Sequence, residues 1–231
     1  MATIITAPFF EIGPKSYLYG DEILELALAA DAASEKYGVD IIFTCPVVDI
    51  RRVKEATKRI HVFAPHMDPI PVGRGLADIL PESLVAAGAE GVMLNHVEKP
   101  VTFEVLAATI QRANEVGLTT IVCADSMADA SKIATLAPDI IVAEPSELIG
   151  TGVSVGPEYV EAAMKSVKNV NENILVLTAA GISNGTDVYN TIIAGADATG
   201  SSSGVAKAAD RPAMVDEMIA AVRKAWDERH N

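Results

Sequence analysis

Short apolar runs alternate with longer amphipathic segments along nearly the whole chain. The apolar runs carry little charge, which is typical of parallel strands buried on both faces. They predict strands at residues 4–10, 39–45, 61–64, 91–94, 118–123, 140–143 and 174–177, and a short strand near Asp197. The segments between them are rich in alanine and leucine. They predict helices at residues 21–36, 47–58, 80–87, 103–115, 127–136, 157–167, 188–193 and 211–229.

Glycine marks several junctions between an expected helix and the next apolar run. Gly38, Gly88, Gly117 and Gly195 all stand at such positions. Glycine after the last helical residue tolerates the left-handed conformation that turns the chain back toward the sheet. Repeated strand–helix units imply parallel crossovers. Eight units favour a single (β/α)8 TIM barrel domain spanning residues 1–231, with an open doubly wound sheet as the alternative.

Two ionisable residues follow expected strands at the same end of this barrel. Glu144 ends the sixth strand and is followed by Pro145, which stops strand pairing, and by a loop that closes at residues 150–152, Gly-Thr-Gly. Catalytic groups of barrel enzymes occupy such strand ends, and loops of this kind can close over a ligand. His96 follows the fourth strand. A neutral imidazole there can donate to a substrate oxygen and transfer a proton, although a structural histidine is the alternative.

The remaining candidates follow the first, seventh and eighth strands. Lys15 can stabilise an oxyanion or bind phosphate, or it can be an ordinary surface lysine. Residues 180–185 and 199–204 are rich in glycine and serine, so their backbone N–H groups can approach a ligand closely. Loops after strands seven and eight commonly bind phosphate in barrels of this type. A flexible surface loop is the alternative interpretation of the second segment.

Composition narrows the class of protein. The formal net charge of −13 argues against non-specific binding of nucleic acid or anionic membranes. Two cysteines, Cys45 and Cys123, indicate a reducing compartment and no disulfide framework. We find no leader sequence and no apolar run long enough to span a membrane, so we expect a cytoplasmic protein. No set of residues has the spacing of metal ligands, and we expect neither a metal nor a cofactor.

Several segments, in the same chain order, resemble the triosephosphate isomerase family, most closely its short archaeal-type branch. The lid segment that begins at Glu144 is the most specific of them, and the resemblance covers nearly the whole chain. The matching segments are residues 15–17 (Lys-Ser-Tyr), 79–82 (Ile-Leu-Pro-Glu), 87–89 (Ala-Gly-Ala), 95–98 (Asn-His-Val-Glu), 144–152 (Glu-Pro-Ser-Glu-Leu-Ile-Gly-Thr-Gly), 180–183 (Ala-Gly-Ile-Ser) and 202–204 (Ser-Ser-Gly).

The resemblance implies an aldose–ketose isomerase that needs no cofactor. Glu144 would remove a proton from the carbon beside the carbonyl, His96 would move a proton between the two enediolate oxygens, and Lys15 would stabilise their charge. Glu98 would lie near the lysine. Residues 145–152 would close over the substrate. The implied substrate- and phosphate-binding residues are Gly13, Lys15, Ile149, Gly150, Gly181, Ser183, Ser202 and Ser203.

Three positions depart from the family pattern. Gly13 replaces an asparagine, Val97 replaces a serine, and Leu76 replaces a threonine that reaches the site of a neighbouring subunit. The lost amide and hydroxyl create room beside the substrate. Three hypotheses follow: a triose-phosphate isomerase of glycolysis and gluconeogenesis, an isomerase of another short sugar phosphate, or a non-catalytic phosphometabolite-binding paralogue. We expect a homo-oligomer, either a dimer or a tetramer.

Overall fold

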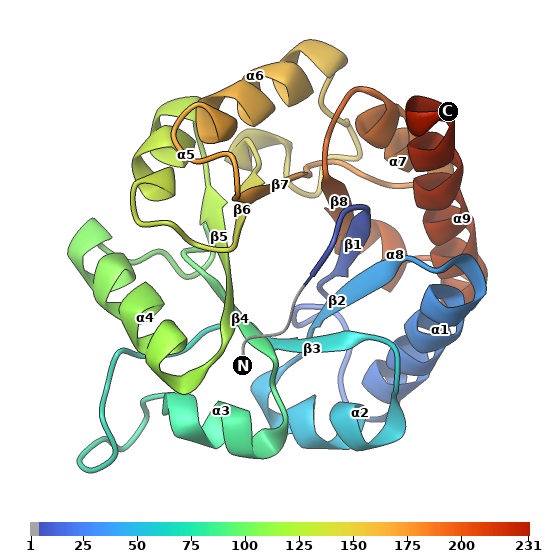
Figure 1. Ribbon diagram of the computed structural model, residues 1–231. Coiled ribbons are helices and arrows are strands. Elements are labelled where there is room, and N and C mark those ends of the chain that lie inside the picture. The colour runs from blue at the N-terminus through green and yellow to red at the C-terminus, as the bar shows by residue number, and fades with distance from the viewer. Residues whose placement is uncertain (1–4) are drawn as a thin grey trace.

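The computed structural model describes residues 5–231 as eight strands that close into a barrel in chain order (Figure 1). All neighbouring strands are parallel, including β1 and β8, which close the ring. The predicted (β/α)8 barrel is therefore confirmed and the open sheet is excluded. The strands are β1 (Phe9–Ile12), β2 (Asp40–Thr44), β3 (His61–Ala64), β4 (Gly91–Leu94), β5 (Thr119–Ala124), β6 (Ile140–Ala143), β7 (Leu175–Thr178) and β8 (Ala198–Ser201).

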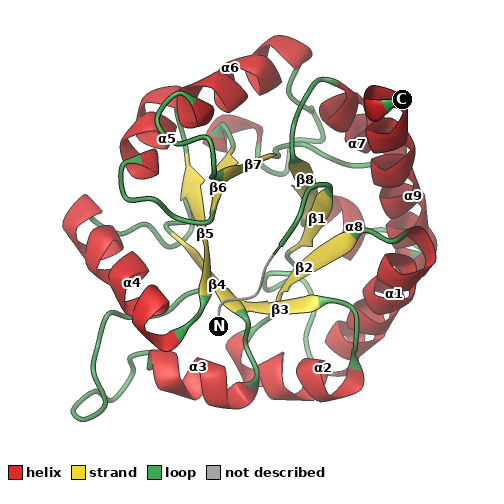
Figure 2. Ribbon diagram, viewed as in Figure 1, coloured by secondary structure: helices red, strands yellow, loops and turns green. Residues whose placement is uncertain are grey.

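Helices surround the barrel on its outside (Figure 2). They are α1 (Asp21–Tyr37), α2 (Ile50–Ala56), α3 (Pro81–Ala87), α4 (Phe103–Val116), α5 (Met127–Ala134), α6 (Pro157–Lys168), α7 (Gly185–Ile193), α8 (Ser203–Ala206) and α9 (Arg211–His230), with 3₁₀ turns η1 (Val47–Asp49) and η2 (Ser146–Leu148). Within residues 5–231 no helix has both the length and the apolar character needed to cross a membrane.

Most element boundaries agree with the predicted ones to within a few residues, but two predictions were wrong in detail. The first strand was expected at residues 4–10, of which residue 4 lies outside the described part of the chain, and it runs from Phe9 to Ile12. It begins directly after Pro8, which lacks the N–H that a paired strand needs. The helix expected at 47–58 is divided into η1 and α2, and α2 ends at Ala56.

Two apolar layers hold the barrel together. Strand alternation directs Phe9, Ile42 and Phe63 into the barrel, where they pack with inward residues of the other strands and with no helix. Phe10, Phe43 and their outward counterparts pack against the helices instead. Glu11 shares the inward face of β1 with Phe9, and only 8% of its surface is exposed. The alternation thus places a carboxylate inside the barrel.

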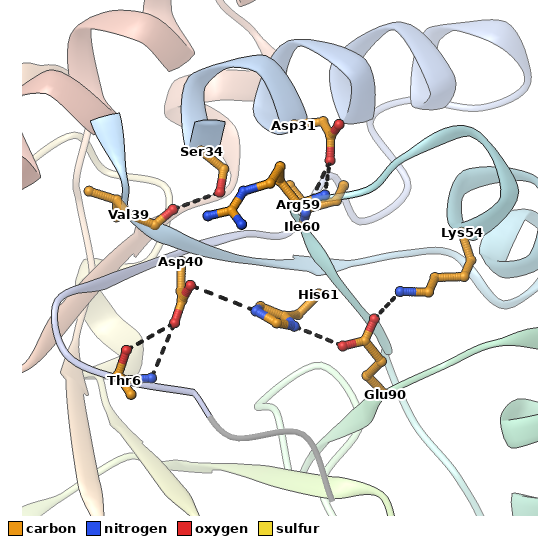
Figure 3. Close-up of polar contacts among 10 residues, drawn as sticks. All are labelled: Thr6, Asp31, Ser34, Val39, Asp40, Lys54, Arg59, Ile60, His61 and Glu90. Carbon is orange, nitrogen blue, oxygen red and sulfur yellow. Dashed lines mark hydrogen bonds and ion pairs between the residues drawn. The ribbon is translucent and has the colours of Figure 1, made fainter. Parts of the chain in front are cut away.

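A charged cluster holds β2, β3 and β4 together at the barrel end where these strands begin (Figure 3). His61 Nδ1 lies 2.7 Å from Glu90 Oε2, and His61 Nε2 lies 3.8 Å from Asp40 Oδ1. Lys54 pairs with the second oxygen of Glu90. Asp40 Oδ2 also accepts hydrogen bonds from the N–H and hydroxyl of Thr6, at 3.3 and 3.1 Å. Each partly buried carboxylate in the cluster therefore has a partner.

The protonation of this cluster follows from burial and charge. Burial lowers the pKa of His61, but the hydrogen bonds and charges of Asp40 and Glu90 outweigh it and raise the pKa to about 9. Burial raises the pKa of Glu90, but His61 and Lys54 outweigh it and lower the pKa to about 2. In the folded protein His61 is therefore a cation and Glu90 an anion at neutral pH.

We expect His61→Gln to lower the free energy of unfolding by about 2 kcal/mol at about pH 6, because two carboxylates lose a charged partner. The folded pKa of His61 is above its unfolded value, so its stabilisation is complete below about pH 6.5 and is lost as the pH rises toward 9. Urea unfolding of both proteins at several pH values measures the difference. An equal difference at about pH 6 and above pH 9 contradicts this assignment.

Candidate active site

A cavity of about 610 Å³ opens at the carboxyl ends of the strands. Its wall contains every residue predicted for the site from the sequence, although these residues come from five different strand ends and the loops that follow them. The predicted residues in the wall are Gly13, Lys15, His96, Glu98, Glu144, Ile149, Gly150, Gly181, Ser183, Ser202 and Ser203. Such a cavity has the size of an ordinary small-molecule site.

Glu144 lies directly after β6 and is largely buried. Its N–H donates to the carbonyl of Ala124, 3.1 Å away, and this bond continues the pairing of β6 with β5. Burial raises the pKa of the Glu144 carboxyl to about 7, against the opposing charge of Lys15. Near neutral pH the carboxyl is therefore present in both protonated and ionised forms. A carboxylate with this pKa is suited to remove and return a proton.

His96 follows β4 in a loop that neighbouring backbone groups hold in place. The N–H of Glu98 donates to His96 Nδ1 at 3.1 Å, so Nδ1 is the acceptor and the ring proton lies on Nε2. Burial, and then the charge of Lys15, lowers the pKa of the imidazole. The arrangement provides a neutral histidine with one N–H to donate.

Asn95 anchors the loop that carries His96. Its side-chain nitrogen donates to the carbonyl of Cys123 at 3.0 Å, and its side-chain oxygen accepts from the N–H of Val101 at 3.2 Å. Its φ angle of 57° places it in the left-handed region, where asparagine is better tolerated than most residues. Asn95 belongs to one of the sequence motifs, but no role was predicted for it. The structure indicates that it positions His96.

Lys15 pairs with Glu98 across the cavity wall. Lys15 Nζ lies 2.8 Å from Glu98 Oε1, and the exposed fractions of the two side chains are 23% and 63%. This hydrogen bond is the main cause of the lowered pKa of Glu98. A pair so exposed on one side adds little to stability. Its effect is to hold the ammonium of Lys15 near Glu144 and His96.

The loops after β7 and β8 are locked together. The hydroxyl of Ser201 donates to the carbonyl of Ile182 at 2.8 Å. Gly204 approaches the same carbonyl so closely that a Cβ there would lie 2.5 Å from the oxygen. Only glycine permits this contact. The hydroxyl of Ser202 is buried and has no hydrogen-bond partner within residues 5–231.

Ser183 lies in the cavity wall, but its donors are already engaged. Its N–H and its hydroxyl both donate to Asp187 Oδ2, at 3.0 and 2.8 Å. Asp187 is in the first turn of α7, whose first N–H groups attract a carboxylate. In this structure Ser183 therefore braces the loop through Asp187.

The segment after Glu144 forms a short lid over the cavity. It contains η2, and the hydroxyl of Thr151 donates to the carbonyl of Leu148 at 2.8 Å. Ile149 and Gly150 contribute to the cavity wall. Gly150 and Gly152 both have positive φ angles, 73° and 75°. Glycines of this kind can absorb the backbone rotation that lid movement requires.

Glu11 also lines the cavity, although it was not among the residues predicted for the site. Burial raises its pKa to about 7; Thr44 and Lys15 act to lower it and Glu144 to raise it. The expected first strand ended at residue 10, so Glu11 was placed outside it. The signal was present: a lone carboxylate inside an apolar run, in register with Phe9 on the inward face. Lys207 was also missed; it lies in the cavity wall, and its Nζ is 4.9 Å from the ring centroid of Tyr17.

The described residues contain no group of three or more His, Cys, Asp or Glu side chains that could hold a metal ion.

The family model described as Triosephosphate isomerase matches residues 14–222. The chain belongs to the triosephosphate isomerase family. The resemblance found in the motifs is thereby confirmed, and the family consists of isomerases that act without a cofactor.

Archaeal triosephosphate isomerases are similar to the chain over nearly its full length. The protein from Sulfolobus acidocaldarius is 34% identical over 226 residues, which cover 96% of this chain and 98% of that protein. The protein from Sulfurisphaera tokodaii is 35% identical, with the same coverage of each chain. The protein from Methanocaldococcus jannaschii is 37% identical over 203 residues, covering 87% of this chain and 92% of that protein.

The three departures from the triosephosphate isomerase pattern lie in different environments. Gly13 is in the cavity wall, two residues before Lys15. Val97 is exposed beside His96 and is not part of the wall. Leu76 is fully exposed on the connection between β3 and α3. Only the departure at Gly13 therefore changes the surface of the cavity directly.

We expect the His96 imidazole to be less than half protonated at about pH 6.5, where an ordinary histidine is half protonated, and its neutral form to carry the proton on Nε2. The reason is burial combined with the N–H that donates to Nδ1. Ring ¹⁵N chemical shifts followed against pH give both the charge and the tautomer, and His96→Asn identifies the signal. A titration midpoint at or above 6.5, or a proton on Nδ1, contradicts the assignment.

Proposed function

We propose that this protein isomerises a short sugar phosphate through an enediolate, in its simplest form interconverting glyceraldehyde 3-phosphate and dihydroxyacetone phosphate. The observation that supports this most is the convergence of Glu144, His96 and Lys15 on one cavity from three separate strand ends. An acid–base carboxyl, a neutral imidazole and an ammonium are the groups that proton transfer beside a carbonyl requires.

In this proposal Glu144 removes a proton from the carbon next to the substrate carbonyl and returns it to the neighbouring carbon. Its pKa of about 7 keeps an ionised fraction available at neutral pH. His96 donates from Nε2 to one oxygen of the enediolate and moves a proton between the two oxygens. Lys15, held by Glu98, stabilises the negative charge that develops on them.

The phosphate end of the substrate fits the loops after β7 and β8. Gly181 and Ser203 provide cavity wall there, and the buried hydroxyl of Ser202 is a donor without a partner among residues 5–231. Ser183 contributes as a direct ligand only if Asp187 releases it. Lid closure by Ile149 and Gly150 excludes water, which strengthens the electrostatic interactions inside and protects the enediolate.

We expect Glu144→Gln to lower kcat by about 10²- to 10⁴-fold with little change in KM, because the amide keeps the shape of the side chain but cannot accept the proton. Coupled oxidation of a reduced nicotinamide cofactor measures the conversion of glyceraldehyde 3-phosphate. Glu172→Gln, which removes an exposed carboxylate outside the cavity, is the matched control. A kcat for Glu144→Gln within tenfold of the natural protein contradicts the role of Glu144.

We also propose that the protein forms a homo-oligomer through the connection between β3 and α3. This segment extends outward from the ring of helices (Figure 1) and carries two exposed apolar side chains, Val72 and Leu76. Neighbouring exposed apolar groups on a projecting loop are typical of a protein–protein contact. Homo-oligomers are the commonest assemblies of soluble enzymes.

We expect Leu76→Asp to weaken self-association by at least about tenfold, because a charge replaces an apolar side chain at the contact. Sedimentation velocity over a range of protein concentrations measures the effect. Val170→Asp, at an exposed apolar residue after α6, is the control. An unchanged sedimentation coefficient for Leu76→Asp, or a natural protein that remains monomeric, rules out this interface.

A further inference from the structure

The carboxyl of Glu11 faces the cavity with one of its two oxygens unused. The hydroxyl of Thr44 donates to Oε1 at 2.5 Å. Oε2 accepts no hydrogen bond, and the carboxyl forms no ion pair, within the described residues 5–231. Oε2 is not one of the buried polar atoms that lack a partner, so it is open to the cavity, where a ligand group can take the place of water. A group that enters the cavity can provide the missing donor.

Two glycines make space for this carboxyl. A Cβ at Gly13, on the same strand end, would lie 3.0 Å from Oε1, and a Cβ at Gly200, the register partner of Glu11 on β8, would lie 3.2 Å from Oε2. The carboxyl therefore extends from residue 11 to the level of residue 13, where the cavity wall begins. It is part of the surface that a ligand contacts and not part of the apolar filling below.

In the proposed reaction every oxygen of a triose phosphate already has a partner other than Glu11. A triose phosphate carries two oxygens on its reacting carbons and a phosphate. His96 and Lys15 bind the two enediolate oxygens, and the loops after β7 and β8 bind the phosphate. Glu11 lies on neither of those loops, and Lys15 is already held by Glu98 at 2.8 Å. A further oxygen is needed if Oε2 is to be engaged.

We propose that Glu11 binds an additional hydroxyl group of the substrate and so selects a four-carbon sugar phosphate over a triose phosphate. The inference rests on the sugar-phosphate isomerisation proposed above and specifies its substrate class. The chemistry is unchanged: a proton leaves the carbon beside the carbonyl, is held by Glu144, and returns to the neighbouring carbon. No oxidant or cofactor is consumed.

The charge of the cavity wall around Glu11 is compatible with a hydroxyl group of the substrate. With a pKa near 7, the Glu11 carboxyl exists in ionised and neutral forms, and a hydroxyl can donate to the first or accept from the second. A second phosphate or a carboxylate would be repelled by Glu11 and Glu144 together. The charge of Glu11 therefore favours substrates in which the part that contacts Glu11 is uncharged.

The test compares the natural protein with Glu11→Gln and Glu11→Ala on two substrate sets. One set holds glyceraldehyde 3-phosphate and dihydroxyacetone phosphate, and the other holds aldotetrose 4-phosphates and ketotetrose 1-phosphates. We expect higher kcat/KM for a tetrose phosphate in the natural protein. We expect Glu11→Ala to lower the ratio of tetrose to triose kcat/KM by on the order of 10- to 100-fold, the usual effect of removing one charged hydrogen-bond partner. Glu172→Gln should leave the ratio unchanged.

Binding measurements test the role of Glu11 without requiring turnover, so they do not depend on the proposed catalytic function. Calorimetric titration with glycerol 3-phosphate and erythritol 4-phosphate, polyol phosphates that differ by one hydroxylated carbon, gives the same comparison. Selective loss of affinity for the longer polyol phosphate in Glu11→Ala supports the inference. Turnover of trioses with no preference for tetroses, or an equal effect of Glu11→Ala on both sets, overturns it and leaves the isomerase intact. Absence of turnover on every sugar phosphate overturns the proposed function and this inference together.

Discussion

Desolvation of carboxyl groups at the mouth of a closed barrel is the constraint on which the site depends. Glu144 and Glu11 each have a pKa near 7 because the barrel wall removes them from water, and Lys15 opposes that shift only in part. The same burial lowers the pKa of His96. One physical cause therefore raises the pKa of two carboxyls and lowers the pKa of an imidazole in the wall of the same cavity.

Charged side chains are paired differently at the two ends of the barrel. Where the strands begin, the charges of His61, Asp40, Glu90 and Lys54 are paired with one another. The pKa values of His61, Asp40 and Glu90 move toward the charged forms. Where the strands end, the carboxyls of Glu144 and Glu11 remain incompletely paired, and their pKa values move toward the neutral form. Paired charges stabilise the fold, whereas incompletely paired ones stay reactive. The closed barrel separates these two requirements along a single axis.

The fold and most of the site could be predicted because their signals are local. Apolar runs, glycine junctions and strand-end positions specify the barrel, and closure brings Lys15, His96 and Glu144 to one rim. Glu11 was not placed, because the apolar pattern did not specify where the first strand begins and ends, and the expected strand stopped one residue before it. The engagement of Ser183 by Asp187 depends on a side-chain rotamer that no sequence pattern encodes. Tertiary contacts of this kind appear only in three dimensions.

The tight contact at Gly204 limits which side chains in the cavity wall can change. With the turns after the last two strands wedged together, a side chain at residue 204 would displace the carbonyl of Ile182, so this part of the wall is locked against gradual change. On the adjoining first strand, the nearest atoms that a side chain at residue 13 would meet belong to the carboxyl of Glu11, which can move aside. Variation in what the barrel recognises can therefore accumulate beside the first strand while the turns after the seventh and eighth strands stay fixed.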